Sequence, residues 1–385
     1  MKNRIVHVIA GLETGGAEIV LYRLLVQLQG TRFDPIVVNL TAGGTIQRLI
    51  TEIGVPVVEL GMRPGVPDPS AVLRLARILR RERPHVVQTW MYHANLIGGL
   101  AARGAGSPPV AWGLHHTDLS PAFIRRSTAL IARTCAPLSR WLPSAIVCCA
   151  ESTMRIHAEL GYALERMLVI PNGFDVGQFR PDPVARAAIR DEAGIPREAK
   201  VVGLVARYHP QKDHRTFLRA ASILRQDRPD VHFLLCGGHV TWDNAELVAM
   251  IDEAGVRDRC HLLGRRTDVE AIQASLDVAC LSSQGGEAFP NTVGEAMACG
   301  VPCVVTDVGD SAVMVGETGR VVRPGDPAAL AAACGALLDL DASELARLGR
   351  LARQRIAERY SLERSVGLYA ELYDRLVNGV MAWAA

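Results

Sequence analysis

The sequence has few aromatic residues, no long apolar run and almost no net charge, and each shortage excludes a class of protein. Aromatic residues make up 5% of the 385, so the cores must be mostly aliphatic. The longest stretch without Lys, Arg, Asp or Glu, Pro84–Ala102, is interrupted by His, Gln and Asn and does not qualify as a membrane span. Lys and Arg total 42 against 40 Asp and Glu, so we expect no nucleic-acid partner.

Zinc-binding cysteine pairs and an export signal are also missing. The nine cysteines are odd in number and scattered, and no Cys-x-x-Cys occurs among them. We therefore expect buried free thiols in a reducing compartment. The short apolar run Ile5–Ala10 is followed by Glu13 and glycines, where a signal peptide would need a longer apolar stretch. These features predict a cytoplasmic protein.

Hydrophobic residues are plentiful, at 49%, and they form short apolar runs that alternate with amphipathic stretches. This alternation is typical of a parallel sheet covered by helices on both faces, which is an α/β fold. A Pro-Asn-Gly turn and a proline-rich linker at 171–182 precede a second alternation. We predict two doubly wound Rossmann-like domains, 1–175 and 176–361, facing a central cleft, with a C-terminal helix in 362–385 that packs back toward the N-terminal domain.

The individual elements can be assigned from the same alternation. The apolar runs predict strands at 5–10, 35–40, 55–60, 85–90, 109–114, 145–149 and 167–170, and then at 200–206, 232–236, 260–263, 277–281, 302–306 and 319–322. The amphipathic stretches predict helices at 17–28, 45–53, 71–83, 93–103, 152–160, 184–193, 214–225, 244–254, 268–274, 292–299, 327–339, 342–360 and 362–381. Ligands of such sheets bind beyond the carboxyl ends of the strands, so residues that follow strands are the candidates for a site.

The segment Ser282–Met297 follows a strand and leads into a helix that begins near Asn291. The free backbone N–H groups of a helix start favour phosphate. Glu287 on the loop and Glu295 on the helix can accept hydrogen bonds from the vicinal hydroxyls of a sugar nucleotide. Two other interpretations stay open: Thr292 and Glu295 also fit a capping box, and Glu287 can be a solvated loop acid.

A pair of cations follows the first strand of the second domain. The guanidinium of Arg207 can fork onto phosphate oxygens, and the ammonium of Lys212 adds a point charge. The alternative is an exposed arginine at a strand end and an unrelated surface lysine. In the first domain, the glycine-rich loop 11–18 opens a helix but lacks the spacing of a dinucleotide-binding or P-loop motif.

Taken together, these motifs resemble the family 4 retaining glycosyltransferases (glycosyl transferases group 1, GT-B fold), of the bacterial surface-polysaccharide type. The spacing of Glu287 and Glu295, followed by Gly-Val-Pro at 300–302, is similar to the family's paired-glutamate motif. Arg207 and Lys212 are similar to the pair that clamps the donor diphosphate in that family. The resemblance covers nearly the whole chain, strongly over 200–327 and more loosely before 170.

The resemblance implies a role for each of these residues. Arg207 and Lys212 would neutralise the leaving diphosphate without a metal, so no metal ligands and no cofactor are expected. Glu295 would hold the ribose of the donor, and Glu287 would hold the hydroxyls of the donor sugar.

The other site residues are likewise implied by the resemblance. A histidine that follows a buried strand of the first domain would contact the transferred sugar or its phosphate, and His115 is favoured over His116. Gly113 stands where the family usually has threonine, which leaves that choice ambiguous. The remaining substrate-binding residues are Gly15 and Gly16 at the donor phosphate, Gly264 and Arg265 near the base, and Phe289, Pro290, Asn291 and Thr292 at the helix start.

The implied function is transfer of a hexose, with retention, from a UDP- or GDP-linked donor to a glycolipid or lipid-linked saccharide in cell-surface polysaccharide or lipopolysaccharide assembly. Three alternatives stay open: a sugar-nucleotide epimerase of the GT-B fold, a transferase acting on a small soluble acceptor such as an inositol phosphate or a sugar phosphate, and a non-catalytic nucleotide-sugar-binding protein. The nucleobase, the sugar and the acceptor are not fixed by the sequence.

A basic and apolar stretch in the first domain bears on the acceptor. Residues 119–150 contain no acidic residue, and such a stretch fits the surface of an anionic membrane, so we expect peripheral contact with its inner face. The alternative is an amphipathic helix of the first domain with a solvated arginine face. The residues concerned are Arg125, Arg126, Arg133 and Arg140 beside Phe123, Ile124, Leu130, Ile131, Trp141 and Leu142.

Overall fold

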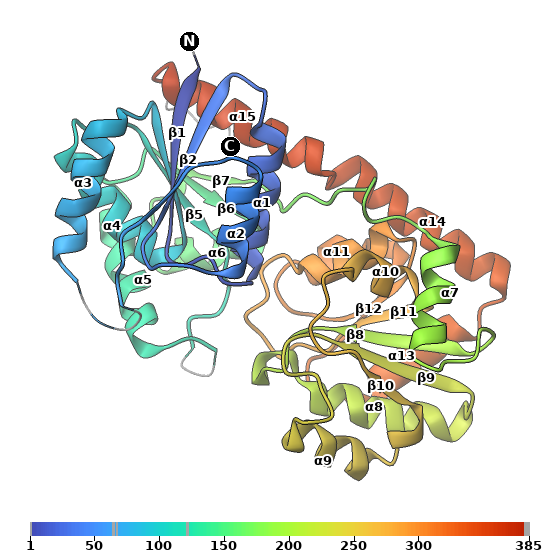
Figure 1. The fold of residues 1–385 in the computed structure, drawn as a ribbon. Coiled ribbons are helices and arrows are strands. Elements are labelled where there is room, and N and C mark those ends of the chain that lie inside the picture. The colour runs from blue at the N-terminus through green and yellow to red at the C-terminus, as the bar shows by residue number, and fades with distance from the viewer. Residues whose placement is uncertain (1, 64–65, 67, 121–122, 381–385) are drawn as a thin grey trace. The chain divides into compact units, whose positions relative to one another are not determined.

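The computed structural model describes residues 2–63, 66, 68–120 and 123–380, and it divides into two units (Figure 1). The first unit comprises Met1–Gly173 with Leu362–Ala385, and the second comprises Phe174–Ser361. Each unit is a parallel sheet with helices on both faces, so the predicted α/β class is confirmed.

In the described part of the first unit the strand order is β3-β2-β1-β4-β5-β6-β7, and all neighbouring strands are parallel. The order reverses between β1 and β4, which is the position where a parallel sheet offers a ligand crevice. The strands are β1 (Asn3–Ile9), β2 (Phe33–Asn39), β3 (Val57–Glu59), β4 (Val86–Trp90), β5 (Val110–Leu114), β6 (Ala145–Cys148) and β7 (Met167–Val169). The helices are α1 (Gly16–Leu28), α2 (Thr45–Glu52), α3 (Ser70–Glu82), α4 (Met91–Gly104), α5 (Arg126–Leu138), α6 (Glu151–Glu159) and α15 (Leu362–Val377).

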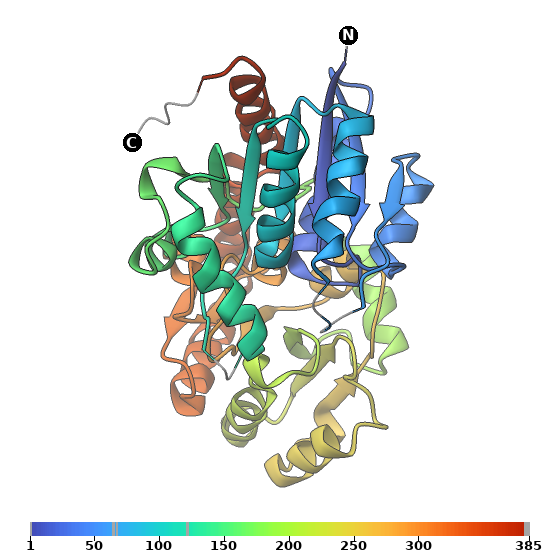
Figure 2. The same cartoon turned by 90° about the vertical axis from the view of Figure 1, so that its left-hand side faces the viewer.

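Two hydrophobic cores lie on opposite faces of this sheet. Val6 and Val8 of β1 belong to one core, whereas Ile5 and Ile9 belong to the other, because successive side chains of a strand point to opposite faces. Helices α3, α4 and α5 cover the first face, and α1, α2 and α15 cover the second (Figures 1 and 2). Helix α15 thus brings the end of the chain back to the first unit.

In the second unit the strand order is β10-β9-β8-β11-β12-β13, again parallel, and it reverses between β8 and β11. The strands are β8 (Lys200–Val205), β9 (Val231–Cys236), β10 (Cys260–Leu262), β11 (Val278–Leu281), β12 (Cys303–Thr306) and β13 (Arg320–Val322). The α-helices are α7 (Pro183–Glu192), α8 (His214–Asp227), α9 (Ala245–Ala254), α10 (Val269–Ala274), α11 (Asn291–Ala298), α12 (Ser311–Val315), α13 (Pro327–Leu338) and α14 (Ala342–Arg359). Helices α8, α9 and α13 bury their apolar sides against one face of the sheet.

The predicted strands are all present, with ends within two residues of their expected positions. The predicted helices are present as well, but α12 was not predicted, and α5 was considered only as one interpretation of the basic stretch. The last helix ends at Val377, whereas its predicted end, Met381, lies outside the described residues. All nine cysteines are buried free thiols, as expected.

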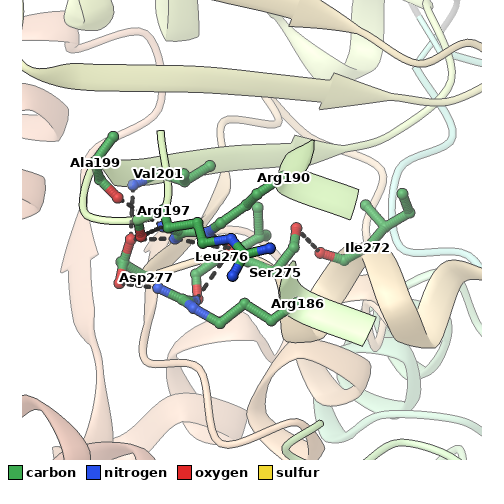
Figure 3. Close-up of polar contacts among 9 residues, drawn as sticks. All are labelled: Arg186, Arg190, Arg197, Ala199, Val201, Ile272, Ser275, Leu276 and Asp277. Atoms are coloured by element: carbon green, nitrogen blue, oxygen red, sulfur yellow. Dashed lines mark hydrogen bonds and ion pairs between the residues drawn. The ribbon is translucent and has the colours of Figure 1, made fainter. Parts of the chain in front are cut away.

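A buried ion pair joins α7 to the amino ends of β8 and β11 (Figure 3). Arg190 is buried, and its guanidinium donates to Asp277 Oδ2 (2.8 Å), to the Ser275 carbonyl (3.0 Å) and to the Ala199 carbonyl (2.7 Å). The same Asp277 oxygen accepts the backbone N–H of Val201 at 2.7 Å. Because every donor and acceptor is matched, this network fixes the edge of the sheet opposite the strands' carboxyl ends.

We expect Arg190→Ala to lower the free energy of unfolding by about 3 kcal/mol, because the change removes the donor to the buried carbonyls of Ser275 and Ala199 and leaves Asp277 with Arg186 as its ionic partner. Urea unfolding measures the effect. Arg197→Ala is the control, because Arg197 forms an exposed pair with Asp191 whose loss should cost at most about 1 kcal/mol. Equal losses in the two variants would contradict the assignment.

A second polar cluster, in which only His232 is fully buried, joins β9 to β10. Arg259 Nη1 lies 3.1 Å from His232 Nε2, and His232 Nδ1 lies 2.8 Å from His261 Nε2. Because an arginine can only donate, Nε2 of His232 must be unprotonated and Nδ1 carries the hydrogen. Burial, followed by the charges of His261 and Arg259, lowers the pKa of His232 to about 4 from its ordinary 6.5.

This shift predicts a loss of stability in acid. The folded-state pKa lies below the unfolded one, so the unfolded chain binds more protons between pH 6.5 and pH 4, and the free energy of unfolding falls as the pH drops through that window. His232→Gln should make the decline shallower by on the order of 1 kcal/mol per pH unit, as measured by urea midpoints between pH 4.5 and 7.5. His239→Asn, at an exposed histidine, should follow the wild type, and a His232→Gln profile parallel to the wild type would refute the assignment.

Candidate active site

The candidate site of the second unit lies where the strand order reverses, beyond the carboxyl ends of β8 and β11. The loop after β8 contains Arg207 and Lys212, and the loop after β11 contains Glu287. Parallel strands deliver these loops to one edge of the sheet, so residues 75 positions apart in the sequence meet there.

The loop after β8 ends in a 3₁₀ turn, Pro210–Lys212, which places the lysine. His209 Nδ1 caps this turn by accepting the backbone N–H of Gln211 at 3.3 Å. Arg207 is exposed. Burial, and then the positive charges of Arg207 and Lys212, lower the pKa of His209, which indicates that both cations lie near this imidazole.

Glu287 is the acidic partner in this site. Its side chain is buried and its Oε1 forms an ion pair with Lys212 Nζ while it also accepts the Ser283 hydroxyl at 2.7 Å. The interpretation of Glu287 as a solvated loop acid is therefore wrong, since only 7% of the residue is exposed. An ammonium and a carboxylate at one sheet edge can bind a ligand that offers both phosphate and hydroxyl groups.

The loop after β12 packs against the backbone of Glu287. Gly309 has φ +55°, and a Cβ at this position would collide with the carbonyl oxygens of Glu287 and Ala288. The backbone N–H of Asp310 donates to the Ala288 carbonyl at 2.9 Å. Position 309 must therefore be glycine for this loop to approach so closely.

Helix α11 contradicts the capping-box interpretation of Thr292 and Glu295. The helix begins at Asn291, its N-cap residue is Pro290, and no side chain caps it. Thr292 is therefore already inside the helix, and its carbonyl accepts the Gln273 amide at 3.0 Å. Glu295 is buried in the second turn of the helix.

The remaining residues at this helix start have different environments. Phe289 is buried, and its ring packs against Phe174 and Tyr360 at centroid distances of 6.3 and 5.0 Å. This side chain is used for packing, so a ligand would meet Phe289 only through its backbone. Asn291 and Thr292 are half-buried.

Gly264 connects the loops that follow β9 and β10 through two backbone hydrogen bonds. Its φ is +63°, its N–H donates to the Val240 carbonyl at 2.9 Å, and its carbonyl accepts the Gly237 N–H at 2.8 Å. Arg265, the next residue, is exposed. Because β10 lies two strands from β8, Arg265 starts roughly 10 Å to the side of the Lys212 loop.

In the first unit, Gly15 and Gly16 lie at the start of α1, after β1, at the position where that strand order reverses. Gly15 is the N-cap residue, and no side chain caps the helix. A Cβ at Gly15 would collide with the Glu18 carboxylate, so the carboxylate already lies over this helix start.

The two candidate histidines differ in their contacts. His115, directly after β5, stacks on Trp90 at a centroid distance of 5.2 Å, and its Nε2 is buried without a hydrogen-bond partner among the described residues. Burial lowers the pKa of His115 to about 4, so the ring is neutral near pH 7. His116 Nδ1 instead accepts the backbone N–H of Asp118 at 3.2 Å and so stabilises a turn.

Sequence reasoning missed the aromatic cluster behind His115. Trp90 Nε1 donates to His7 Nδ1 at 3.3 Å, and the Trp90 ring lies 6.0 Å from that of Tyr369 on α15. The same reasoning gave no account of Gly113, where a Cβ would lie 2.8 Å from the Thr89 carbonyl. A tryptophan at the last position of a predicted strand was the available signal.

In the described ranges, no three His, Cys, Asp or Glu side chains are arranged to coordinate a metal ion. Nor does any helix in those ranges have the length and apolar character to cross a membrane.

Comparison with known proteins places this geometry in a family. Residues 199–340 match the family described as Glycosyl transferases group 1, and residues 14–178 match the one described as Glycosyltransferase Family 4. The two matched segments contain the candidate residues of the second and first units, respectively.

Curated relatives include two with different acceptors in their names. The UDP-Gal:alpha-D-GlcNAc-diphosphoundecaprenol alpha-1,3-galactosyltransferase of Escherichia coli is 26% identical over 254 residues, which is 65% of either chain. The D-inositol 3-phosphate glycosyltransferase of Corynebacterium urealyticum is 34% identical over 222 residues, 55% of this chain and 51% of that protein. The chain thus spans about half to two thirds of the length of these relatives.

Among solved structures, Anabaena HepE in complex with UDP and glucose is similar over 96% of this chain and 99% of that one, with a TM-score of 0.84 and 22% identity. This likeness concerns the fold. The two matched segments lie in the two parallel-sheet units, and the likeness to HepE extends over both: the chain belongs to the family 4 glycosyltransferases, glycosyl transferases group 1, and has their GT-B fold.

Proposed function

We propose that this protein is a retaining glycosyltransferase that transfers a sugar from a nucleotide-diphosphate donor, with UDP-sugars as the first candidates. The observation that supports this most directly is the meeting of Lys212 and Glu287 where the strand order reverses, with Arg207 on the same loop as the lysine. Family membership supports the reaction class. The names of the E. coli relative and of the HepE complex support UDP.

The cations act on the leaving group. Arg207 and Lys212 bind the diphosphate and neutralise the negative charge that develops on it as the glycosidic bond breaks. Donor binding draws the Lys212 ammonium from Glu287 to a phosphate oxygen. The freed oxygen of Glu287 then accepts a hydroxyl of the donor sugar, while Ser283 continues to orient the carboxylate.

The reaction needs no protein nucleophile. The bond between the anomeric carbon and the diphosphate oxygen breaks, and the acceptor oxygen forms its bond on the same face. The acceptor's proton passes to the leaving phosphate oxygen, so atoms and charges balance. The protein contributes positioning and electrostatic stabilisation, with Glu295 on the ribose and the N–H groups at the start of α11 near phosphate.

The first unit contributes His115. A neutral imidazole with an unpartnered ring nitrogen offers a hydrogen bond to a hydroxyl or phosphate oxygen without adding charge. Its stacking on Trp90 fixes the plane of the ring. His116 is the weaker candidate, because its Nδ1 already accepts a backbone N–H.

UDP without metal should stabilise the protein, and Lys212→Ala should abolish that stabilisation. At about 100 times its Kd a ligand adds roughly 2.7 kcal/mol, which is several degrees in Tm. Each variant is compared with its own ligand-free Tm, so a stability loss from removal of the Lys212–Glu287 ion pair does not confuse the result. Arg215→Ala, which removes an exposed arginine of α8, is the control and should behave as wild type.

Turnover is measured on the same proteins with UDP-glucose and candidate acceptors, and Lys212→Ala should lower it by about 10²-fold or more. Consumption of the donor without any acceptor, giving an isomeric nucleotide sugar, would favour the epimerase alternative. UDP binding without turnover on any acceptor would favour the non-catalytic alternative. No shift with UDP, GDP or ADP would refute the proposal.

We propose further that the acceptor is lipid-linked and that the first unit meets it at an anionic membrane surface. Helices α3, α4 and α5 lie side by side on one face of the first sheet, and we call them the basic helix layer (Figure 2). These three helices contain one acidic residue, Glu82, and it is paired with Arg4 and Arg81. The exposed residues of the layer include Arg77, Arg80, Arg81, Arg103, Arg126, Arg133, Leu73, Leu100 and Leu130.

Helix α5 combines charge with exposed apolar groups. Ala132, Cys135 and Ala136 anchor it in the first core, which agrees with the interpretation as an amphipathic helix. On its outer side Leu130 is 66% exposed, and Trp141 just beyond the helix is 68% exposed. Arginines around exposed leucine and tryptophan suit anionic headgroups with apolar chains beneath them.

The protein should therefore float with vesicles of phosphatidylcholine and phosphatidylglycerol at 70:30. At roughly 1 kcal/mol per arginine, changing Arg126, Arg133 and Arg140 to Gln should weaken binding by about 10²-fold. The matched control changes Arg215, Arg219 and Arg257 of the second unit, which are also exposed. Equal binding to neutral vesicles, or equal loss in both triple variants, would refute membrane contact and favour a soluble acceptor such as an inositol phosphate.

A further inference from the structure

We propose that Asp213 and Gln284 are positioning residues that hold Lys212 and Glu287 in their reactive geometry. This inference deepens the proposed function and rests on it for the meaning of that geometry. The two residues belong to different loops, and neither was among the site residues expected from the sequence.

Asp213 has an unusual backbone conformation for its residue type. It follows Lys212 directly and adopts φ +47° and ψ +58°, the left-handed region that non-glycine residues rarely occupy. It is 7% exposed, and its Oδ1 accepts the backbone N–H of Thr216 at 3.1 Å to cap α8. A residue held in this conformation next to a site is held by its surroundings.

Gln284 supplies those surroundings from the loop after β11. Its side-chain Nε2 donates to Asp213 Oδ2 at 2.9 Å, and its backbone N–H donates to the Gln211 carbonyl at 2.9 Å. The hydroxyl of Ser282 donates to the carbonyl of Lys212 at 2.8 Å. Lys212 and both of its sequence neighbours are thus bonded to the same three-residue segment, 282–284.

The same segment sets the position of Glu287. Ser283 donates to Glu287 Oε1, and its own carbonyl accepts the hydroxyl of Thr306 at 2.7 Å. Gly309 packs against the Glu287 carbonyl from the other side. Residues 282–284 therefore hold the lysine with one set of bonds and the glutamate with another, and a shift of the segment changes the geometry of both.

The Asp213–Gln284 bond is the only one of these contacts that joins two side chains across the loops without involving Lys212 or Glu287. Its loss leaves the ion pair and the backbone bonds in place. We expect loss of the Asp213–Gln284 bond to lower kcat more than the affinity for the nucleotide. The flexible stem of Lys212 can still reach a phosphate, whereas misalignment of about 1 Å at the reacting centre costs up to 10²-fold in rate.

Four variants test the proposal. Gln284→Ala should lower kcat for donor hydrolysis and for transfer from UDP-glucose by about tenfold, with the Kd for UDP changed less than threefold. Gln284→Glu should be worse, because it sets a carboxylate against Asp213. The double variant Asp213→Asn/Gln284→Glu should recover most of kcat, because the asparagine amide now donates to the new carboxylate while its Oδ1 still caps α8.

Gln178→Ala is the matched control, because Gln178 and Gln284 are both exposed and the amide of Gln178 contacts the carboxylate of Glu270 in the same unit. It should retain the wild-type kcat. The proposal is overturned if Gln284→Ala behaves like this control, or if the double variant is no better than Gln284→Glu.

Hydrogen exchange without ligand separates this proposal from the proposed function. The amides of residues 282–287 should exchange faster in Gln284→Ala and return toward the wild-type rate in the double variant. That result, together with absence of UDP binding by the wild type, would leave the positioning contact standing and refute the transferase. Unchanged exchange together with normal UDP binding would refute the contact and leave the transferase.

Discussion

Parallel strand pairing is the constraint on which both units depend, because it brings all the loops that follow strands to one edge of each sheet. In the second unit the strand order reverses between β8 and β11, and the two loops that emerge there contain the opposite charges of Lys212 and Glu287. The other edge of the same sheet is fixed by the buried Arg190–Asp277 pair. The charged groups at the ligand edge can therefore be arranged for binding, because they are not needed to hold β8 and β11 in place.

In the first unit, too, the loops that follow parallel strands meet at one edge of the sheet, but two of the side chains there are aromatic and uncharged rather than oppositely charged. The ends of β4 and β5 contribute Trp90 and His115, and burial keeps that histidine neutral by lowering its pKa. Helix α15 returns from residue 362 to pack Tyr369 against Trp90, so the last part of the chain belongs to the same core. The sheet edge of the second unit thus presents charged side chains, whereas that of the first presents a neutral imidazole.

Most of the fold could be predicted because strands buried on both faces are continuous apolar runs, whose ends are visible in the sequence. Helix α12 was missed because five residues give no periodicity, and α5 was left undecided because its arginines fit a solvated face as well as a membrane-facing one. The candidate site residues were predicted from a resemblance to a family. The burial of Glu287 could not be predicted from its neighbours in the sequence, because it depends on the ion pair with Lys212, which is 75 residues away. The capping box failed because Pro290, rather than Thr292, precedes the first helical turn.

Under the proposed function, the Lys212–Glu287 ion pair gives one site a way to bind a donor and to release its product. Without ligand, Lys212 compensates the charge of a buried carboxylate that also accepts the Ser283 hydroxyl. A nucleotide sugar replaces the ammonium at Glu287 with sugar hydroxyls while its diphosphate takes up the lysine, so both charges remain compensated. After transfer, in the proposed reaction, the diphosphate has no sugar to offer, and a lysine bound to the diphosphate no longer compensates the charge of Glu287. In the proposed reaction, re-formation of the Lys212–Glu287 ion pair therefore favours departure of the nucleotide, and the site prefers donor over product.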